Sequence, residues 1–324
     1  MQPESILFSI VIPTYNRPER LATCLQSLVE LDYRRDRFEV IVVNDGSTVD
    51  LESVVLPVQQ QLNLTLITQA NAGPATARNT GATAAKGRFL IFTDDDCVLL
   101  PQHLTTLEAR FAETPDGLIG GRTLNALPNN LCSTASQLLI DYLYDYFNTD
   151  ITGSSFFASN NFAMPSDRFR VLGGFDTSFP LAAGEDREFC DRWLFHGYAM
   201  RYASDVQIYH AHNLTVKSFW RQHFNYGRGA FCFRQVREQR SHHQTTPDPI
   251  QVEPLRFYVD LVTYPFSRSS QHAIPLTILL FLSQVANVAG FFWARSQHHR
   301  RQQSLIPSST QHSELAKEGG QHGD

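Results

Sequence analysis

The chain has 324 residues and an ordinary globular composition, with 42% hydrophobic and 18% charged residues. This length suits one large domain or one domain with an appendage. A net charge of −5 provides no basic footprint for nucleic acid, and five scattered cysteines without a Cys-x-x-Cys pair indicate neither a zinc site nor a disulfide framework.

Strands that are buried on both faces are predicted early in the chain. Residues 6–12 form an apolar run broken only by Ser9, which is typical of such a strand. A helix is predicted from Pro18, because proline is tolerated in the first turn of a helix. Two further apolar runs, at residues 39–43 and 64–67, predict the second and third strands of the same sheet.

An alanine-rich helix and a fourth strand follow. The helix is predicted from the segment 71–79 to about Ala85, and the fourth strand covers residues 89–92. That strand ends abruptly in three carboxylates, at residues 94–96. The order strand, helix, strand, strand, helix, strand predicts βαβ crossovers and therefore an α/β fold with a mostly parallel sheet.

Polar side chains follow three of these strands, at residues 14–16, 44–47 and 94–96. In open α/β sheets, ligands bind at the carboxyl ends of the strands. Three adjacent carboxylates repel one another, and a divalent cation such as Mg²⁺ or Mn²⁺ would offset that repulsion. An isolated acidic run would instead be a solvated loop. No Gly-x-Gly-x-x-Gly follows the first strand and no Walker lysine occurs, so side chains and a metal would have to hold a nucleotide.

Four motifs occur in a fixed order: Ser9–Arg17 (SIVIPTYNR), Val43–Thr48 (VNDGST), Asn71–Asn79 (NAGPATARN) and Thr93–Asp96 (TDDD). Together they resemble those of family 2 glycosyltransferases, over about residues 6–230. The resemblance implies the GT-A fold, with a mostly parallel, Rossmann-like sheet flanked by helices. It also implies transfer of a sugar from a nucleotide-diphospho-sugar, with inversion at the anomeric carbon.

The resemblance further implies a donor site at the strand ends. The Asp45 carboxylate would accept a hydrogen bond from the nucleoside base, and Arg78 would lie near the diphosphate or the base. A UDP-sugar is the favoured donor. The residues implied to bind it are Pro13, Thr14, Tyr15, Asn16, Asp45, Arg78, Asp94 and Asp95. Two simpler interpretations stay open, an Asx turn at Asp45 and a solvated helix face at Arg78.

A divalent metal, Mn²⁺ or Mg²⁺, is implied at the Asp-x-Asp pair formed by Asp94 and Asp96. Asp96 is the expected direct ligand, while Asp94 would face the ribose and the water shell of the metal. A histidine often completes this site in the family. His210 and His212 are two residues apart and share one face of a predicted strand, and His212 is the favoured ligand.

The acceptor side is predicted at the start of a helix that follows Gly184. A single displacement needs a group that removes the proton of the acceptor hydroxyl, and a carboxylate can do this. The resemblance implies Asp186 as this general base and Glu185 as a residue that orients the acceptor. Asn160 and Asn161, on a strand predicted at residues 159–164, would face the donor sugar and the acceptor. Alternatively, the two acidic residues merely complement the helix dipole.

Further helices are predicted at residues 133–147, at residues 218–227 with an end at Gly227, and at residues 255–266. Residues 274–294 then form a run of 21 residues without a charge, flanked by arginines. This run could span a bilayer, lie on a membrane surface or pack in a soluble core, and the surface location is favoured.

The predicted division of the chain is a glycosyltransferase domain at residues 1–235, a helical, membrane-associated appendage at 236–302 and a disordered tail at 303–324. Residues 1–5 lead into a strand without a basic segment, so no secretory signal is expected. The expected location is the cytoplasm or the cytoplasmic face of a membrane.

Together these features predict an inverting glycosyltransferase with a glycan, polysaccharide or lipid-linked acceptor. The main alternative is a non-catalytic nucleotide-sugar-binding protein, which should lack either the base or the metal pair. A nucleotidyltransferase shares the type of sheet, but its glycine-rich signature with Arg and Lys is absent after the first strand.

Overall fold

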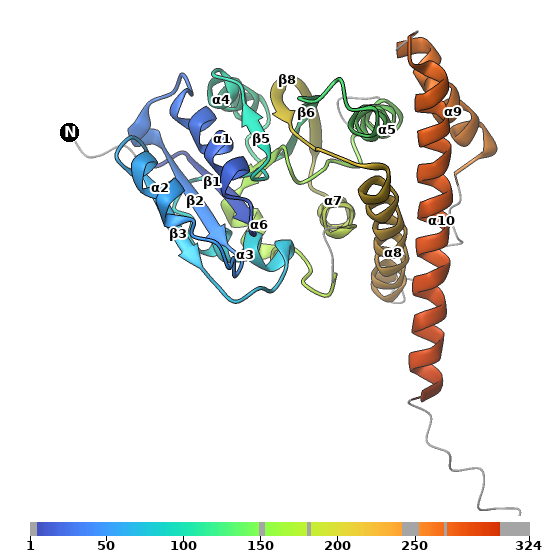
Figure 1. The fold of residues 1–324 in the computed structure, drawn as a ribbon. Coiled ribbons are helices and arrows are strands. Elements are labelled where there is room, and N and C mark those ends of the chain that lie inside the picture. Colours follow the sequence, from blue (N-terminus) through green and yellow to red (C-terminus); the bar gives the residue numbers. More distant parts are fainter. Residues whose placement is uncertain (1–4, 149–152, 180–182, 242–252, 269–270, 305–324) are drawn as a thin grey trace, which may run out of the picture.

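A computed structural model describes residues 5–148, 153–179, 183–241, 253–268 and 271–304. Its centre is an eight-stranded sheet with the order β3-β2-β1-β4-β7-β6-β8-β5 (Figure 1). The strands are β1 (Phe8–Thr14), β2 (Phe38–Asn44), β3 (Leu64–Thr68), β4 (Phe89–Phe92), β5 (Cys97–Leu99), β6 (Leu118–Asn125), β7 (Phe162–Pro165) and β8 (Met200–His210).

The first four strands are mutually parallel, as the apolar runs predicted. In β1, Ile10 lies between Val40 of β2 and Ile91 of β4, and β3 pairs with the far side of β2. Antiparallel pairs occur only around β7 and at the β5–β8 edge among the described residues. The α/β class with a mostly parallel sheet is therefore confirmed.

Helices cover both faces of this sheet because alternate residues of each buried strand point to opposite sides. Ile10 and Ile12 pack on one face with α1, α2 and α4, whereas Val11 packs on the other with α3, α6 and α7. These helices are α1 (Pro18–Val29), α2 (Glu52–Gln59), α3 (Pro74–Ala84), α4 (His103–Glu113), α6 (Ser166–Val171) and α7 (Glu185–Phe195).

Helix α2 was not expected from the sequence, which predicted the second and third strands to follow each other directly. The helix has eight residues and contains Pro57, so its sequence lacks a clear helical pattern. Only Val55 and Val58 are buried, both in the core beneath α1. Tertiary packing, rather than local propensity, therefore accounts for this helix.

The predicted helix end at Gly227 is wrong, because α8 (Val216–Ser241) continues through it. Here glycine allows two helices to approach closely instead of ending one of them. A Cβ atom at Gly227 would lie 1.8 Å from the carbonyl oxygen of Asn287, and one at Gly290 would lie 1.9 Å from that of Phe224. These two contacts fix the crossing of α8 and α10.

Gly229 forms a similar contact between α8 and the residues just before α7. An added Cβ would lie 2.1 Å from the carbonyl oxygen of Ala183. We expect Gly229→Ala to lower the free energy of unfolding by about 1–3 kcal/mol, because the backbone has to move to accept the methyl group. Thermal or urea unfolding would measure this loss. Lys217→Ala, at an exposed position of the same helix, should change little, and equal stability of the two variants would contradict the proposed contact.

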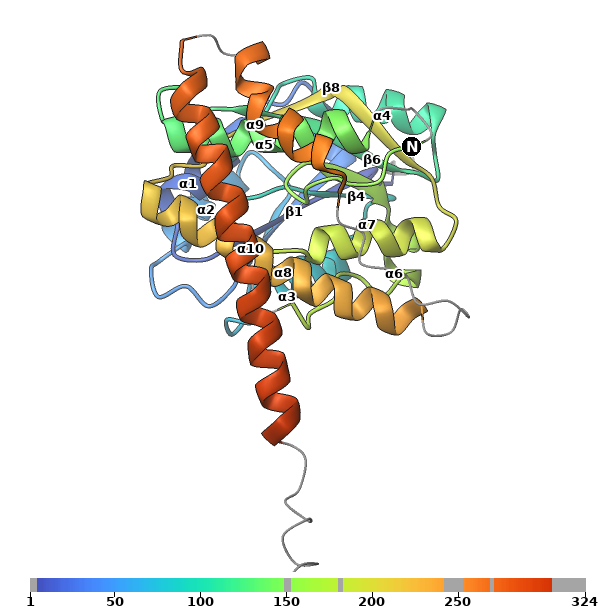
Figure 2. The same cartoon turned by 90° about the vertical axis from the view of Figure 1, so that its right-hand side faces the viewer.

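The remaining helices form a layer beyond the sheet. They are α5 (Leu131–Phe147), α9 (Leu255–Arg268) and α10 (Ala273–Ser304), and they pack on one another and on α8 (Figure 2). The predicted helices at 133–147, 255–266 and 274–294 are thus present with longer bounds. The predicted domain boundary at 235/236 falls inside α8, and residues 305–324 of the predicted tail lie outside the described residues.

Helix α10 is also the one described helix whose length and apolar composition would allow it to cross a membrane. The same composition is found in helices that are buried in soluble proteins. A third of its most apolar window is buried within the chain, so composition alone does not assign its surroundings.

Candidate active site

The carboxylates that follow β4 are each paired with an arginine. Arg78 donates to Asp94 at 2.8 Å, Arg17 to Asp95 at 3.2 Å and Arg20 to Asp96 at 2.8 Å. These three ion pairs connect α3 and the start of α1 to the loop at the carboxyl end of β4. The acidic run is therefore not a solvated loop, and neighbouring guanidinium groups offset the repulsion that the sequence suggested.

Asp95 is buried at the end of β1. Its Oδ2 accepts a hydrogen bond of 2.8 Å from Thr14 Oγ1, so the two implied donor-site residues are in contact. Burial raises the pKa of Asp95 to about 6, although the charge of Arg17 acts in the opposite direction. The Asp95 carboxylate therefore holds the ends of β1 and β4 together through Thr14.

Asp96 faces the end of β8. Its Oδ1 lies 3.2 Å from His210 Nε2. Burial acts to raise the pKa of Asp96, but the hydrogen bond and charge of His210 outweigh it and hold this pKa below its usual range. Asp96 therefore keeps a negative charge at neutral pH, which a metal ligand requires.

The ligand atoms of Asp96, Cys97 and His210 lie within 4.8 Å of one another. A carboxylate and an imidazole are ordinary ligands for Mn²⁺, so this donor set fits the implied ion. Burial keeps the pKa of the Cys97 thiol well above its ordinary value, which makes it the weakest candidate of the three.

It is His210, rather than the favoured His212, that contacts Asp96. Cys97 pairs with His210 across the β5–β8 edge, and this register brings His210 to the acidic run. The ring of His212 stacks on that of His210 with centroids 4.9 Å apart. Burial lowers the pKa of His212 to about 4, so it is a neutral imidazole beside the site. Its role as a ligand stays a prediction.

Asp45 holds the loop that precedes α3. Its carboxylate accepts hydrogen bonds of 2.8 Å from Gln69 Nε2 and of 2.9 Å from the backbone N–H groups of Ala72 and Gly73. The Asx-type turn is made instead by Asn44, whose Oδ1 accepts from Ser47 N–H at 2.8 Å. The predicted contact of Asp45 with a base would have to coexist with these bonds.

The remaining implied donor residues line the ends of β1 and β2. Asn16 adopts a left-handed backbone conformation with φ of 55°, and its Oδ1 accepts from Thr48 N–H at 2.8 Å. The contact joins the loop after β1 to the loop after β2. Tyr15 beside it is exposed and Pro13 is partly exposed, so both rings border the open side of this edge.

Arg78 links this edge to the start of α7. Its side chain is buried, and its Nη2 bonds Asp94 while its Nη1 donates to Glu185 Oε1 at 3.1 Å. The interpretation as a solvated helix face is therefore wrong. The two carboxylates that this buried guanidinium pairs are 16 and 107 residues away from it in the sequence, so Arg78 brings the predicted donor and acceptor sides together.

Glu185 and Asp186 begin α7 just after Gly184, which has a φ of +93° that favours glycine. Glu185 is buried, and its Oε2 has no hydrogen-bond partner among the described residues. Burial, together with the charge of Asp186, raises the pKa of Glu185 to about 7. Asp186 is partly exposed, and desolvation also raises its pKa. Glu185 can thus take up a proton near neutral pH, and the shift of Asp186 has the same direction.

The raised pKa of Glu185 predicts a pH-dependent stability. The pKa of Glu185 is near its ordinary value of 4.5 in the unfolded chain and near 7 in the folded chain. The contribution of this group to the unfolding free energy is therefore full below about pH 4.5 and is lost as the pH rises through 7. With metal removed by chelator, we expect the unfolding free energy of the wild type relative to Glu185→Gln to fall by about 1–3 kcal/mol between pH 5 and pH 8. A difference that stays constant over this range, measured by urea unfolding, would contradict the raised pKa.

The predicted acceptor-side amides lie in the turn before β7 rather than on the strand itself. Asn161 Nδ2 donates to the carbonyl oxygens of Arg122 and Val206, both at 3.1 Å, where the β6–β8 register shifts. Asn160 is buried, and its Oδ1 accepts from Thr123 at 3.4 Å. The amide nitrogen of Asn161 thus supports the sheet, and a role of either residue toward an acceptor stays a prediction.

Several polar residues at this site were not assigned a role from the sequence. Arg17 and Arg20 are three residues apart at the start of α1, directly after a strand. This spacing is the feature of the sequence that could have indicated their place in the site.

On α8, the hydroxyl of Tyr226 accepts a hydrogen bond of 2.8 Å from Gln222 Nε2. Burial raises the pKa of Tyr226, and the charges of Asp186 and Glu185 add to the shift.

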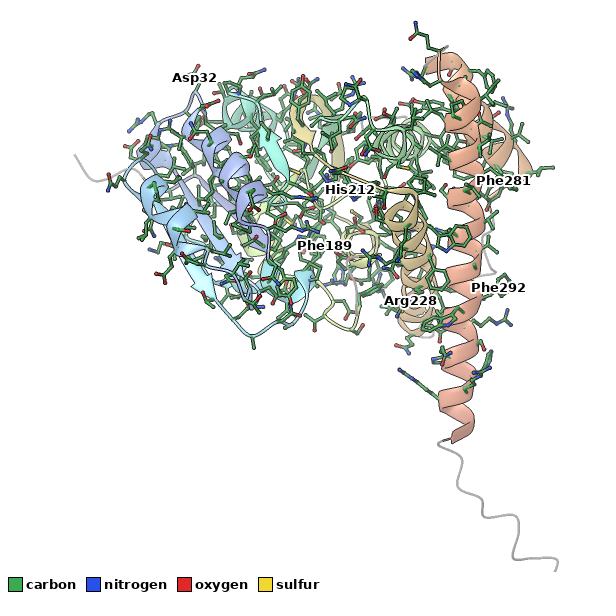
Figure 3. All side chains as sticks on the ribbon, viewed as in Figure 1. Asp32, Phe189, His212, Arg228, Phe281 and Phe292 are labelled. Atoms are coloured by element: carbon green, nitrogen blue, oxygen red, sulfur yellow. The ribbon has the colours of Figure 1, made fainter. Side chains whose placement is uncertain are left out.

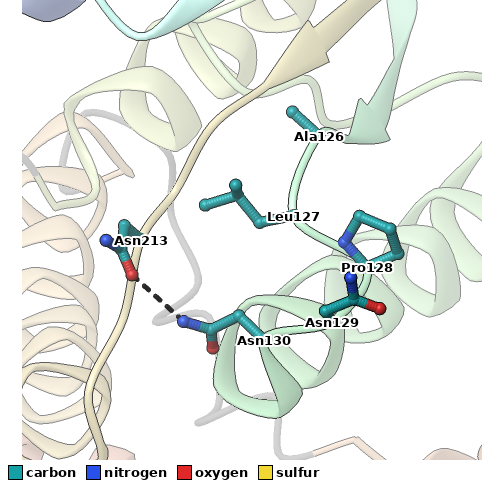
Figure 4. Close-up of a pocket in the computed structure, with 6 residues that line it drawn as sticks. All are labelled: Ala126, Leu127, Pro128, Asn129, Asn130 and Asn213. Atoms are coloured by element: carbon teal, nitrogen blue, oxygen red, sulfur yellow. Dashed lines mark hydrogen bonds between the residues drawn. The ribbon is translucent and has the colours of Figure 1, made fainter.

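A pocket lies beyond the end of β6 (Figure 4). Asn130 Nδ2 closes one side of it with a bond of 3.1 Å to Asn213 Oδ1. Its other lining residues are Ala126, Leu127, Pro128 and Asn129. None of these side chains is titratable, so the pocket offers no acid–base chemistry of its own.

The chain is similar in sequence to known glycosyltransferases. A family model described as glycosyl transferase family 2 matches residues 9–171. The chain is 27% identical to glycosyltransferase AglE of Haloferax volcanii over 201 residues, which cover 61% of this chain and 64% of that protein. It is 29% identical to a validoxylamine A glucosyltransferase of Streptomyces hygroscopicus subsp. jinggangensis over 222 residues, which cover 60% and 53%. The matched regions thus span less than two thirds of either relative.

A solved structure shows the same fold. Mannosyltransferase PcManGT of Pyrobaculum calidifontis, in complex with GDP-Man and Mn²⁺, aligns with a TM-score of 0.57 and 20% sequence identity. The alignment covers 94% of this chain and 82% of the mannosyltransferase. This likeness supports the expected GT-A fold.

Proposed function

The chain belongs to glycosyl transferase family 2, and we propose that it transfers a sugar from a nucleotide-diphospho-sugar to an acceptor hydroxyl with inversion at the anomeric carbon. The observation that carries this proposal is the double pairing of buried Arg78 with Asp94 and Glu185. It joins an acidic donor edge to Glu185, and Glu185 and the neighbouring Asp186 both have a raised pKa. One side of the site can thus bind a phosphorylated donor while the other accepts a proton.

The donor side would be formed by the strand ends of β1, β2 and β4. Arg17 and Arg20 keep part of their guanidinium groups exposed, so they can donate to a diphosphate as well as to Asp95 and Asp96. A divalent ion held by Asp96, His210 or Asp94 would supply charge neutralisation for the leaving nucleoside diphosphate. PcManGT was solved with GDP-Man and Mn²⁺, and a UDP-sugar remains the donor expected for this chain.

On the acceptor side, Asp186 would act as the general base. As the acceptor oxygen forms its bond to the anomeric carbon, the bond from that carbon to the diphosphate oxygen breaks. The proton of the acceptor hydroxyl moves to the Asp186 carboxylate, and the negative charge leaves with the nucleoside diphosphate. Glu185 would be a positioning residue, because Arg78 already engages one of its oxygens.

The acceptor is proposed only as a class, a carbohydrate or lipid-linked hydroxyl. A non-catalytic protein that binds nucleotide sugars remains the second candidate. It would need the donor edge but not the proton-accepting carboxylates at the start of α7. Two adjacent carboxylates with raised pKa values therefore favour the enzyme.

A donor screen tests this proposal. UDP- and GDP-sugars would be added to the full chain with Mn²⁺, with Mg²⁺ or with chelator, and thermal unfolding would be recorded. We expect at least one donor to raise the Tm in the presence of metal and to do so far less with chelator, because a ligand that binds only the folded state stabilises it. If no nucleotide sugar shifts the Tm under any condition, the proposed donor site is wrong.

A further inference from the structure

Helix α10 exposes a continuous apolar face. Six of its residues, spaced alternately by four and three positions, are between 40% and 68% exposed. This spacing places them on one side of a helix, over about 27 Å at 1.5 Å per residue. We call this face the α10 stripe, and it consists of Ile274, Ile278, Phe281, Val285, Val288 and Phe292. Figure 3 shows Phe281 and Phe292 on the side of α10 that is turned away from the sheet.

The opposite face of α10 is covered by the rest of the chain. Leu276 and Leu280 pack into the clusters around α5, and Gly290 contacts the backbone of α8. Farther along, Phe291 lies against Phe231 of α8 with ring centroids 5.5 Å apart. Since α5 and α8 cover this face of α10, the opposite face, which carries the stripe, is the one that can contact a membrane.

The charges on α10 and on the chain next to it in the sequence have one sign. From residue 261 to residue 313 the sequence contains four arginines and no aspartate or glutamate, although the whole chain has a net charge of −5. Past Phe292, the same face continues with Arg295 and His299, both exposed. Neither Arg295 nor Arg300 forms an ion pair within the described part of the chain.

We propose that the α10 stripe lies in the interface of a membrane that contains anionic phospholipid. An apolar face without charges, followed by a basic end, is the pattern by which amphipathic helices bind such surfaces. A second copy of the chain would also cover the apolar residues, but α10 itself carries no acidic side chain to meet the arginines of a partner. The inference does not depend on the proposed transferase activity.

Vesicle flotation tests this proposal with the full-length chain. Vesicles of phosphatidylcholine alone would be compared with vesicles that contain about 30% phosphatidylglycerol. We expect the chain to float with the anionic vesicles. The double variant Phe281→Glu/Val288→Glu should bind them at least about tenfold more weakly, since it places two charges in the apolar face. Arg295→Gln/Arg300→Gln should weaken binding to the anionic vesicles and should lower its sensitivity to salt.

Matched controls come from exposed apolar residues elsewhere. Leu56 of α2 and Val171 of α6 are 57% and 73% exposed, and Leu56→Glu/Val171→Glu should float like the wild type. Thermal unfolding would show that each variant is folded. The proposal is wrong if the wild type does not float, or if the stripe variant floats equally well. It is also wrong if sedimentation shows a dimer that the stripe variant dissociates while vesicles are not bound.

Discussion

Asp186→Asn should leave the donor affinity nearly unchanged and lower the transfer rate by about 10²–10⁴-fold, the usual contribution of a general base. The amide has nearly the same shape as the carboxylate but cannot accept the proton of the acceptor hydroxyl. Donor binding would be followed by calorimetry in the presence of Mn²⁺, and turnover by the release of nucleoside diphosphate. The structure favours this outcome because Asp186 is partly exposed, whereas Glu185 is engaged by Arg78.

Asp167→Asn is a matched control for this variant. Asp167 lies in the first turn of α6 and accepts a hydrogen bond of 2.8 Å from the N–H of the next residue, as Asp186 does at the start of α7. If the effect of Asp186→Asn were only the loss of a helix-terminal charge, both variants would have similar consequences. Full turnover by Asp186→Asn would rule out its assignment as the base.

Asp96→Asn should raise the Kd of the donor at least about tenfold in the presence of Mn²⁺, which corresponds to about 1.4 kcal/mol. The substitution removes the charge that faces His210 and therefore the best-placed candidate ligand. With chelator, the variant and the wild type should bind the donor equally weakly. Calorimetric titration of the donor with and without Mn²⁺ would measure both effects.

Asp205→Asn serves as the control for Asp96→Asn, because Asp205 also pairs with an arginine, Arg110, but lies away from the strand ends. We expect it to bind the donor like the wild type. An Asp96→Asn variant that keeps its metal-dependent affinity would exclude a ligand role for Asp96.

The central sheet could be predicted because strands of a parallel sheet are buried on both faces, so their sequences are continuous apolar runs. The runs that contain Ile10, Val42 and Ile91 therefore identified β1, β2 and β4, and the polar residues after them indicated where the candidate site lies. Helix α2 was not predicted because it is short and contains Pro57. The continuation of α8 past Gly227 was not predicted, because a glycine that ends a helix cannot be distinguished in a sequence from one that permits close packing of two helices.

The pairing of charges within the site could not be predicted in the same way. Arg20 and Asp96 are 76 residues apart, and Arg78 and Glu185 are 107 apart, so no local pattern connects them. The choice between His210 and His212 depends on the register of β5 against β8, which places His210 opposite Cys97. Sequence spacing alone puts both histidines on one face.

The anomeric configuration of the product tests the central claim most directly. The donor found in the thermal screen would be incubated with the chain and Mn²⁺, and the first sugar product, with water or an added hydroxyl compound as the acceptor, would be followed by proton NMR. We expect a product whose anomeric configuration is opposite to that of the donor, formed only when metal is present. A product that retains the donor configuration, or one that forms equally fast with chelator, would contradict the account.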